Sequence, residues 1–455
     1  MGEQSPSLHV HDVEPGHADG VSQWPGLDVQ DLLAAVCCLL WVATDPHGGL
    51  GSDKAARDRR SAPWLKDAQL TRAGAIFSHN TTSIARSRPS KPQSPKVGPG
   101  IVPTVKHFAP LQPPTGGIAT VVSTLVDQAR VSDQRWHYVS HNTYGSQPIL
   151  ATLRVIAWAL ATRFRRLDFD VAHLHVSHGL SVVRKAIVAI AIGKRRPIVV
   201  ELHSGTLLVP GVRSRWELAF WDFLTRRADV VLCLNREVES HVVARLAGST
   251  GAPTTEVIAN CVAVPPNIEA TKAAGRTTLV FLGRLGTRKG VDTLLEAFAL
   301  LDSPTTTLLL CGDGDIQPWA AQAERLGISS SVTFTGWVDK RQSWSYLKSA
   351  TALILPARAE GLPMSVIEAL GVGVPVIVTP VGGIPDYLVD GRDALIIPAE
   401  DPRALADSIR RVISDPELAA ALSRGGLITY AQNFDPAILI DRLSDLYSAL
   451  ESHSS

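Results

Sequence analysis

The sequence predicts an α/β protein of two tandem doubly wound, Rossmann-like domains that face each other across a cleft. From Ile101 onward, short β-branched apolar runs alternate with amphipathic helical stretches, which is typical of parallel sheets covered by helices. A Pro- and Ala-rich connector at Val264–Arg276 interrupts this alternation, and a second series follows it. The chain of 455 residues is also too long for one ordinary core.

The first domain is expected over residues 98–265. It begins with the strand and loop IVPTVKHFAP and the helix GGIATVVSTLVDQAR. The strand VAHLHV and the helix LSVVRKAIVAIAI come next, followed by the strand PIVVELH and the helix RWELAFWDFLTRRA. The strands DVVLCLN and TEVIAN complete the series.

The second domain is expected over residues 266–435, followed by a C-terminal helix within 436–455. Its expected strands are TTLVFLG, TTTLLLCG, SVTFTG, ATALILP, VPVIVT and ALIIP. The apolar pattern of PAILIDRLSDLYSALE predicts the last helix but does not say where it packs. A ligand is expected in the cleft, where the carboxyl ends of the strands of both sheets face each other.

Residues 1–97 are rich in Ser, Pro, Gly, Asp and Arg, and we expect a disordered extension that ends in the linker SRPSKPQSPKVGPG. One short helix is expected at Val29–Ala43. The apolar run Leu32–Ala43 is about half the length that a membrane span needs. The five scattered cysteines lack zinc-ligand spacing and indicate a reduced compartment, so a cytoplasmic location is expected.

Charge divides unevenly between the two domains. Residues 98–265 carry 18 Lys and Arg against 11 Asp and Glu, a balance of +7, whereas residues 266–455 carry 16 against 22, a balance of −6. The basic groups RFRR, GKRR and VRSR lie in the first domain. They indicate either ordinary solvated turns or peripheral contact with an anionic membrane, on its inner face. Nucleic acid is not expected as a partner, because no nucleic-acid motif accompanies these groups.

Basic residues follow the first strand of the second domain. Arg284 and Lys289 stand in the Gly-punctuated loop RLGTRKG, and a helix is expected to begin near Val291. Basic side chains at the carboxyl end of a parallel sheet suit a phosphate-bearing ligand. The alternative is a loop that is merely solvated.

Two carboxylates, Glu360 and Glu368, lie eight positions apart in the largely apolar segment ARAEGLPMSVIEALGVGVPVIV. Pro363 suits the first turn of a helix, so free amides around Gly361 would point at a ligand. A local ion pair with Arg358 is the alternative for Glu360, but it leaves Glu368 unexplained. As free acceptors both glutamates would bind hydroxyls, and a phosphate-bearing, hydroxyl-rich ligand is a nucleotide sugar.

From Lys106 to about Tyr447 the chain resembles the retaining glycosyltransferases of the GT-B fold, family 4 (glycosyltransferase group 1). The resemblance covers about three quarters of the chain, and the two glutamates match the family's E-x7-E signature. The motifs that carry it, in order, are PPTGGIATVV, DVAHLH, ELHSG, FLGRLGTRKG, GDGD, FTGWV, EGLPMSVIEAL and VGGIPDYLVDG. NCV at Asn260–Val262 departs from the family's usual Asn-Gly pair, and residues 1–97 have no counterpart.

The resemblance implies a role for each matching residue. Arg284 and Lys289 would neutralise the donor diphosphate, and Glu368 would bind the donor ribose. Glu360 would bind the transferred sugar, and His203 would contact that sugar near its anomeric carbon. The other implied donor contacts are the backbone of Gly361, Leu362, Pro363 and Met364, the base-side residues Gly336, Trp337 and Val338, and the first-domain glycines Gly116 and Gly117.

No metal or other cofactor is expected, because fixed cations and amides can stabilise a departing diphosphate. The DFD at Asp168–Asp170 and the DGD at Asp313–Asp315 are interpreted as turns rather than metal ligands. His173 and His175 alternate along VAHLHV and share one face. We interpret them as structural; zinc is the alternative, and the sequence shows no third ligand for it.

The expected activity is transfer of a sugar from a nucleoside diphosphate sugar to a hydroxyl of a glycan, polysaccharide or lipid-linked acceptor, with retention. A nucleotide-sugar epimerase or a phosphorylase on the same plan is the alternative among enzymes. A non-catalytic sugar-nucleotide-binding protein is the alternative outside them. The sequence does not identify the base, the sugar or the acceptor.

Overall fold

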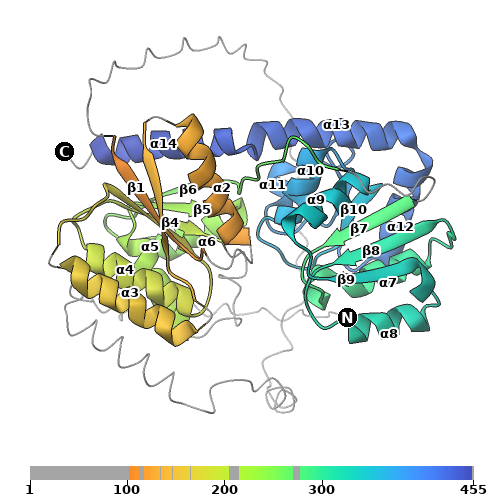
Figure 1. The fold of residues 1–455 in the computed structure, drawn as a ribbon, viewed down its shortest axis with the longest axis horizontal. Helices are drawn as coiled ribbons and strands as arrows, with labels where there is room; N and C mark the ends of the chain where they lie inside the picture. The colour runs from red at the N-terminus through yellow and green to blue at the C-terminus, as the bar shows by residue number, and fades with distance from the viewer. Residues whose placement is uncertain are drawn as a thin grey trace, which may run out of the picture. The chain divides into compact units, whose positions relative to one another are not determined.

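The computed structural model describes residues 102–111, 117–133, 135–145, 147–163, 165–203, 215–269 and 277–452. The predicted extension 1–97, its helix at 29–43 and the predicted donor contact Gly116 lie outside these residues. Two parallel sheets with interleaved helices form the described chain (Figure 1). None of the helices in the described part is both long and apolar enough to cross a membrane.

The first sheet has six parallel strands in the order β2-β1-β3-β4-β5-β6. The central strands β3, β4 and β5 are buried along their whole length, as expected of strands covered on both faces. The strand bounds are β1 Thr104–Ala109, β2 His137–Asn142, β3 Val171–Val176, β4 Ile198–Leu202, β5 Val230–Cys233 and β6 Thr254–Val257.

Helices alternate with these strands: α2 Gly117–Ser132, α3 Pro148–Arg163, α4 Leu180–Ile192, α5 Arg215–Arg227 and α6 Arg236–Leu246. The sequence pattern did not predict β2, α3 or α6. The strand β2 was missed because it is an edge strand whose residues HYVSHN are mostly polar and only partly buried. The helix α6 carries a clear start signal, since the Asn235 side chain accepts a hydrogen bond from the amide of Val238.

The second sheet has six parallel strands in the order β12-β11-β10-β7-β8-β9. The chain order reverses between β7 and β10, and in the first sheet it reverses between β1 and β3. Ligands of doubly wound proteins bind at such switch points, outside the carboxyl ends of the strands. The bounds are β7 Thr277–Leu282, β8 Thr306–Cys311, β9 Val332–Gly336, β10 Ala352–Leu355, β11 Val376–Val378 and β12 Leu395–Ile396.

The helices of the second domain are α7 Val291–Ala299, α8 Gln317–Arg325, α9 Lys340–Ser349, α10 Met364–Val372, α11 Ile384–Tyr387, α12 Pro402–Ser414 and α13 Pro416–Asn433. The helix α7 begins at Val291, as predicted. Pro363 is the residue before α10 rather than part of its first turn, so this helix begins one residue later than expected.

The C-terminal helix α14, Pro436–Ser452, packs on the first domain although it follows the second in sequence. Leu439, Leu443 and Tyr447 belong to the same buried cluster as Val105 of β1. At the surface, Arg135 forms ion pairs with two aspartates of α14, Asp441 at 3.0 Å and Asp445 at 2.6 Å. The first domain therefore contains the last helix of the chain.

Candidate active site

The loop after β7 positions the two predicted basic residues. Gly283 ends the strand next to the side chain of Lys289, whose Nζ would lie 3.3 Å from an added Cβ. Gly290 has a φ of +73°, and an added Cβ there would lie 1.9 Å from the carbonyl oxygen of Pro356. Only glycine fits between this turn and the end of β10. The turn thus holds Lys289 close to the loop that follows β10.

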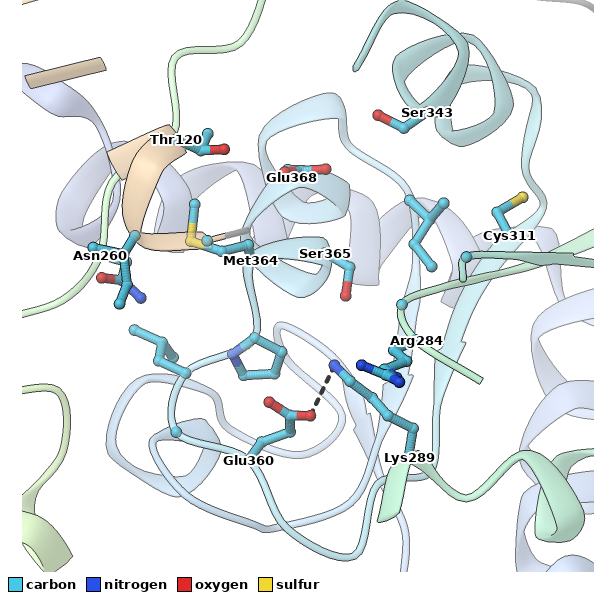
Figure 2. Close-up of a pocket in the computed structure, with 18 of the residues that line it drawn as sticks. Thr120, Asn260, Arg284, Lys289, Cys311, Ser343, Glu360, Met364, Ser365 and Glu368 are labelled. Carbon is cyan, nitrogen blue, oxygen red and sulfur yellow. Dashed lines mark ion pairs between the residues drawn. The ribbon is translucent and has the colours of Figure 1, made fainter. Parts of the chain in front are cut away.

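That loop carries Glu360, which forms ion pairs with two cations. Lys289 Nζ lies 2.7 Å and Arg288 Nη1 lies 3.0 Å from Oε1 of Glu360. Figure 2 shows the pair of Glu360 and Lys289 in the pocket. The side chains of Glu360 and Lys289 are 11% and 13% exposed, whereas that of Arg288 is 53% exposed. Lys289 is therefore the better shielded of the two partners.

Arg358 is not the partner of Glu360, so the alternative of a local ion pair is wrong. Its guanidinium binds both carboxylate oxygens of Asp292, at 2.7 and 2.8 Å, and Glu400 at 2.7 Å. These contacts raise the pKa of Arg358, mainly through the hydrogen bonds to Asp292 and Glu400. Arg358 fastens the β10 loop to α7, and this leaves Glu360 facing Lys289 from the other side of the same loop.

The backbone of Gly382 and Gly383 packs closely against the loop that carries Glu360. Gly382 has a φ of +58°, and a Cβ there would lie 2.2 Å from the carbonyl oxygen of Glu360 and 2.4 Å from that of Gly361. The amide of Gly383 donates to the same Gly361 carbonyl at 2.5 Å. The Asn235 side chain of the first domain also donates to it, at 3.3 Å. The position of Glu360 is thus fixed by close backbone contacts.

Glu368 lies in the second turn of α10 and is only 5% exposed. Burial raises the pKa of its carboxyl group, and the nearby charge of Lys340 opposes this rise. Lys340 Nζ forms an ion pair with Glu368. Asp339 caps α9 by accepting from the amide of Gln342, which places Lys340 at the first position of that helix.

The amino end of α10 is open toward the same space. Pro363 precedes the helix, and no side chain caps it. Within the described residues, the backbone amides of Gly361, Leu362 and Met364 donate to no acceptor. Free amides at the positive end of a helix dipole favour an anion. Arg284 likewise is exposed and makes no hydrogen bond or ion pair within the described chain.

These groups line one cavity of about 470 Å³ between the first and second domains. Gly336 is not among its lining residues, although Trp337 and Val338 are. The sequence-predicted residues that line it are Gly117, His203, Arg284, Lys289, Trp337, Val338, Glu360, Gly361, Leu362, Pro363, Met364 and Glu368.

Sequence reasoning missed several polar residues of this cavity. Lys340 and Ser343 come from α9, and Thr120 and Asn260 come from the first domain. Lys340 carried one signal, because it is the first basic residue after FTGWV. Its partner Glu368 lies 28 positions away, and such a contact can be found only from the packing of α9 against α10.

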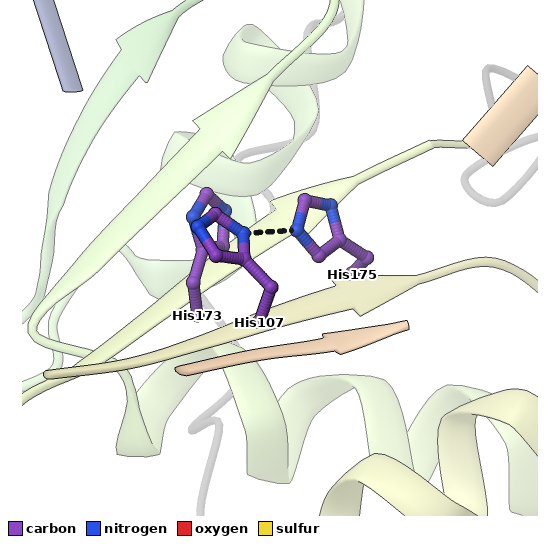
Figure 3. A group of neighbouring side chains, drawn as sticks. All are labelled: His107, His173 and His175. Atoms are coloured by element: carbon purple, nitrogen blue, oxygen red, sulfur yellow. Dashed lines mark hydrogen bonds between the residues drawn. The ribbon is translucent and has the colours of Figure 1, made fainter. Parts of the chain in front are cut away.

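On the first-domain side, His203 belongs to a buried group of four histidines and one carboxylate. His203 Nε2 lies 2.8 Å from His175 Nδ1, and His175 Nε2 lies 2.9 Å from His107 Nδ1. Figure 3 shows His107, His173 and His175 together. Glu201 Oε2 lies 3.1 Å from both His173 and His175, and Oε1 lies 3.3 Å from His203.

Burial controls protonation in this histidine group. It lowers the pKa of His203 and of His107, and it lowers that of His175 to about 3. Burial alone would raise the pKa of Glu201, but His203 and the other histidines outweigh it and hold this pKa well below its usual range. At neutral pH Glu201 is therefore a carboxylate, and the imidazoles of His107, His175 and His203 are neutral.

The same atoms are the ones that could hold a metal ion. The ligand atoms of His175, Glu201 and His203 lie within 4.8 Å of one another, and those of His107, His173 and His175 do so as well. Sequence reasoning saw no third ligand for His173 and His175, because the neighbours come from other strands of the sheet. In the structure His175 is hydrogen-bonded directly to His203 and to His107.

Comparisons with known proteins agree with this geometry. Residues 100–263 match the family model of glycosyltransferase family 4, and residues 267–427 match that of glycosyl transferases group 1. The chain is 27% identical over 252 residues to a glycogen synthase of Mycobacterium tuberculosis, covering 54% of this chain and 60% of that protein. It is 31% identical over 187 residues to a D-inositol 3-phosphate glycosyltransferase of Streptomyces avermitilis, covering 38% of this chain and 40% of the relative.

Solved structures share the fold. Anabaena HepE in complex with UDP and glucose superposes with a TM-score of 0.61 at 19% identity, over 76% of this chain and all of HepE. A sucrose-phosphate synthase from Thermosynechococcus elongatus gives 0.64 at 19% identity, over 77% of this chain and all of that one. With two family models matched in tandem across both sheets, the chain belongs to the family 4, group 1 glycosyltransferases of the GT-B fold.

Proposed function

We propose that this protein is a retaining glycosyltransferase that moves a sugar from a nucleoside diphosphate sugar to an acceptor hydroxyl. The proposal rests on one observation: Arg284, Lys289, Glu360 and Glu368 all line the same cavity. Lys289 is paired with Glu360, whereas Arg284 has no partner among the described residues. Arg284, Lys289 and the open end of α10 bind the diphosphate. Glu368 binds the ribose hydroxyls, and Glu360 binds the hydroxyls of the sugar.

The reaction forms one bond and breaks another. The acceptor oxygen bonds to the anomeric carbon while the bond from that carbon to the phosphate oxygen breaks, and its electron pair stays on the diphosphate. The acceptor proton leaves to the diphosphate or to solvent. Negative charge therefore grows where Arg284, Lys289 and the α10 amides are aimed, and one such donor can be worth about 3 kcal/mol. This chemistry needs no metal, and we propose that none takes part.

Retention requires either front-face attack or a covalent intermediate. The ion pair with Lys289 engages one oxygen of Glu360 already. This favours a role for Glu360 in holding the sugar rather than in attacking it. His203 lines the cavity from the first domain and is proposed to contact the sugar near its anomeric carbon.

UDP-sugars are the first donors to test, because HepE is described in complex with UDP and glucose. The acceptor is proposed to be a glycan, a polysaccharide or a lipid-linked sugar bound by the first domain, whose charge balance is +7. A cytoplasmic location is proposed, with peripheral contact at the inner face of the membrane for a lipid-linked acceptor.

The test is a panel of UDP-, GDP- and ADP-sugars, scored by thermal shift and then by turnover, with NMR of the anomeric proton of the product. One donor should stabilise the protein, since a ligand at 100 times its Kd adds about 2.7 kcal/mol. Lys289→Ala and Glu368→Ala should lower turnover by at least about 100-fold without unfolding the chain. Wild-type rates in both variants would refute the proposal. Conversion of the donor sugar to its epimer without acceptor would favour the epimerase.

A further inference from the structure

Two adjacent basic residues of α4 are buried at the switch point of the first sheet. Lys185 is 1% exposed and Arg184 is 6% exposed. The helix α4 follows β3, which lies beside β1 where the strand order reverses. In the second sheet, Arg284 and Lys289 follow β7, one of the two strands at the switch point, and are proposed to bind phosphate. The first sheet thus has cations at the position where a doubly wound domain binds ligands.

Neither cation has a carboxylate partner within the described chain. Lys185 Nζ lies 2.7 Å from Thr143 Oγ1 and 3.3 Å from Ser181 Oγ, and both of these groups are neutral. The Arg184 side chain makes no hydrogen bond or ion pair to the described residues, and its Nε is buried without an acceptor. Most arginine forks in folded proteins are paired when they are this deeply buried.

Burial of these charges is costly. Burial, together with the smaller effect of the neighbouring charge of Arg184, lowers the pKa of Lys185 to about 7. Burial also lowers the pKa of Arg184. Apolar residues of similar size would be more stabilising at such positions. Two buried cations without a carboxylate partner among the described residues are therefore candidates for binding an anionic ligand.

The pair also lies close to the candidate active site. The charge of Lys185 contributes to lowering the pKa of His203, which lines the donor cavity. Arg184 lies near Tyr144, the half-exposed residue that follows β2. Thr143, the hydroxyl partner of Lys185, directly precedes Tyr144 in the segment after β2.

We propose that Arg184 and Lys185 bind a phosphate group of the acceptor substrate, with Thr143 and Ser181 as hydroxyl partners. Two cations and two hydroxyls match the double charge and the several oxygens of a phosphate better than those of a carboxylate. The inference rests on the proposed function only in calling the ligand an acceptor. The phosphate can belong to a soluble phosphorylated compound or to a lipid headgroup.

The test uses the full chain with the donor cavity saturated with UDP, so that added phosphate cannot bind there. Inorganic phosphate and glycerol phosphate are titrated by calorimetry into the wild type, Arg184→Gln, Lys185→Met and the double variant. Lys194→Met, at an exposed position just beyond α4, is the matched control. We expect at least a tenfold loss of phosphate affinity in Arg184→Gln and Lys185→Met, and none in the control.

Thermal unfolding separates this role from a structural one. Lys185→Met should raise Tm, because it removes a buried charge, whereas a lysine kept for its hydrogen bonds would lower Tm when lost. Equal phosphate affinity in the wild type and the double variant, or no phosphate binding by the wild type, would overturn the proposal.

Two further experiments identify the source of the phosphate and separate a failure of the proposed donor from a failure of the phosphate site. Flotation with phosphatidylcholine vesicles, with and without phosphatidic acid, is compared with glycerol phosphate binding; vesicle binding lost in the double variant indicates a lipid acceptor. The titrations are repeated in Lys289→Ala without UDP. If UDP never binds but phosphate binding still depends on Arg184 and Lys185, the proposed donor is wrong and the phosphate site stands.

Discussion

The two sheets present charge at their carboxyl ends in opposite ways. In the second domain each of the two site glutamates has a basic partner from another element: Glu360 has Lys289, and Glu368 has Lys340. In the first domain the charges are separated. Glu201 contacts His175 and His203, whose imidazoles burial keeps neutral, and Lys185 has only hydroxyl partners among the described residues.

This difference predicts how each domain responds to a ligand. The pairs of the second domain already compensate each other, so a bound donor exchanges one partner for another at modest cost. The first domain holds its charges without such partners, and the cost of desolvating them is already included in the folded state. Its groups are therefore preorganised, and removing one changes stability as well as binding.

We expect the largest loss of activity when Lys289 of the second domain is removed. Lys289→Ala should lower kcat by about 10²–10³-fold, because it removes a cation that we propose binds the leaving diphosphate. The measurement is steady-state transfer with the best nucleotide sugar.

Arg288→Ala is the matched control for this prediction, since Arg288 also pairs with Glu360 but is 53% exposed. Exposed ion pairs contribute little, so its effect should stay below about fivefold. Equal losses in the two variants would show that Lys289 acts only through Glu360.

The next effect tests the preorganised side. The Tyr447 hydroxyl lies 2.6 Å from His173 Nδ1, and both residues are fully buried. Tyr447→Phe should lower the free energy of unfolding by about 1–3 kcal/mol, because it leaves a buried ring nitrogen without its partner. Urea unfolding measures this, with Tyr144→Phe at a 41% exposed position as the control. A loss no larger than the control's would contradict a stabilising role for the hydrogen bond between Tyr447 and His173.

The smallest expected effect is a pH dependence of the unfolding free energy that comes from Glu368. Burial raises the pKa of Glu368 in the folded state, so the folded protein binds this proton more tightly than the unfolded chain. Relative to Glu368→Gln, the wild type should lose unfolding free energy as pH rises from about 4 through the raised pKa. The loss should be about 1.4 kcal/mol for each pH unit between the unfolded-state and folded-state pKa values. Above the folded-state pKa the difference should be constant.

Lys340→Met should extend this pH window upward, because the Lys340 charge opposes the rise in the pKa of Glu368. The measurement is urea unfolding of the three proteins at several pH values. A stability difference between wild type and Glu368→Gln that does not vary with pH would show that folding does not change the pKa of Glu368.

Sequence alone predicted most strands of both sheets, because buried parallel strands are continuous apolar runs such as VVLC and ALIL. It failed at β2, where an edge position permits polar residues. Within the site, the loop positions of Lys289 and Glu360 were predictable from the strand-to-loop pattern. The Lys289–Glu360 pair was not, since it joins residues from two different loops, and Arg358 was the nearer candidate in sequence.

The histidine group was also beyond sequence reasoning, for a related reason. His173 and His175 share one face by simple alternation, but His107 and Glu201 come from β1 and β4. Only the strand order places β1 and β4 on either side of β3. Alternation predicts a face of a strand, whereas neighbours across a sheet require its topology.

The return of α14 to the first domain has a consequence for how the protein is made. Leu439, Leu443 and Tyr447 of α14 complete the buried cluster of the first domain that includes Val105 of β1. During synthesis that core stays unfinished until α14 has left the ribosome, after the whole second domain has emerged. A nascent chain stopped at residue 435 would therefore hold a completed second sheet beside a first one with an uncovered apolar face.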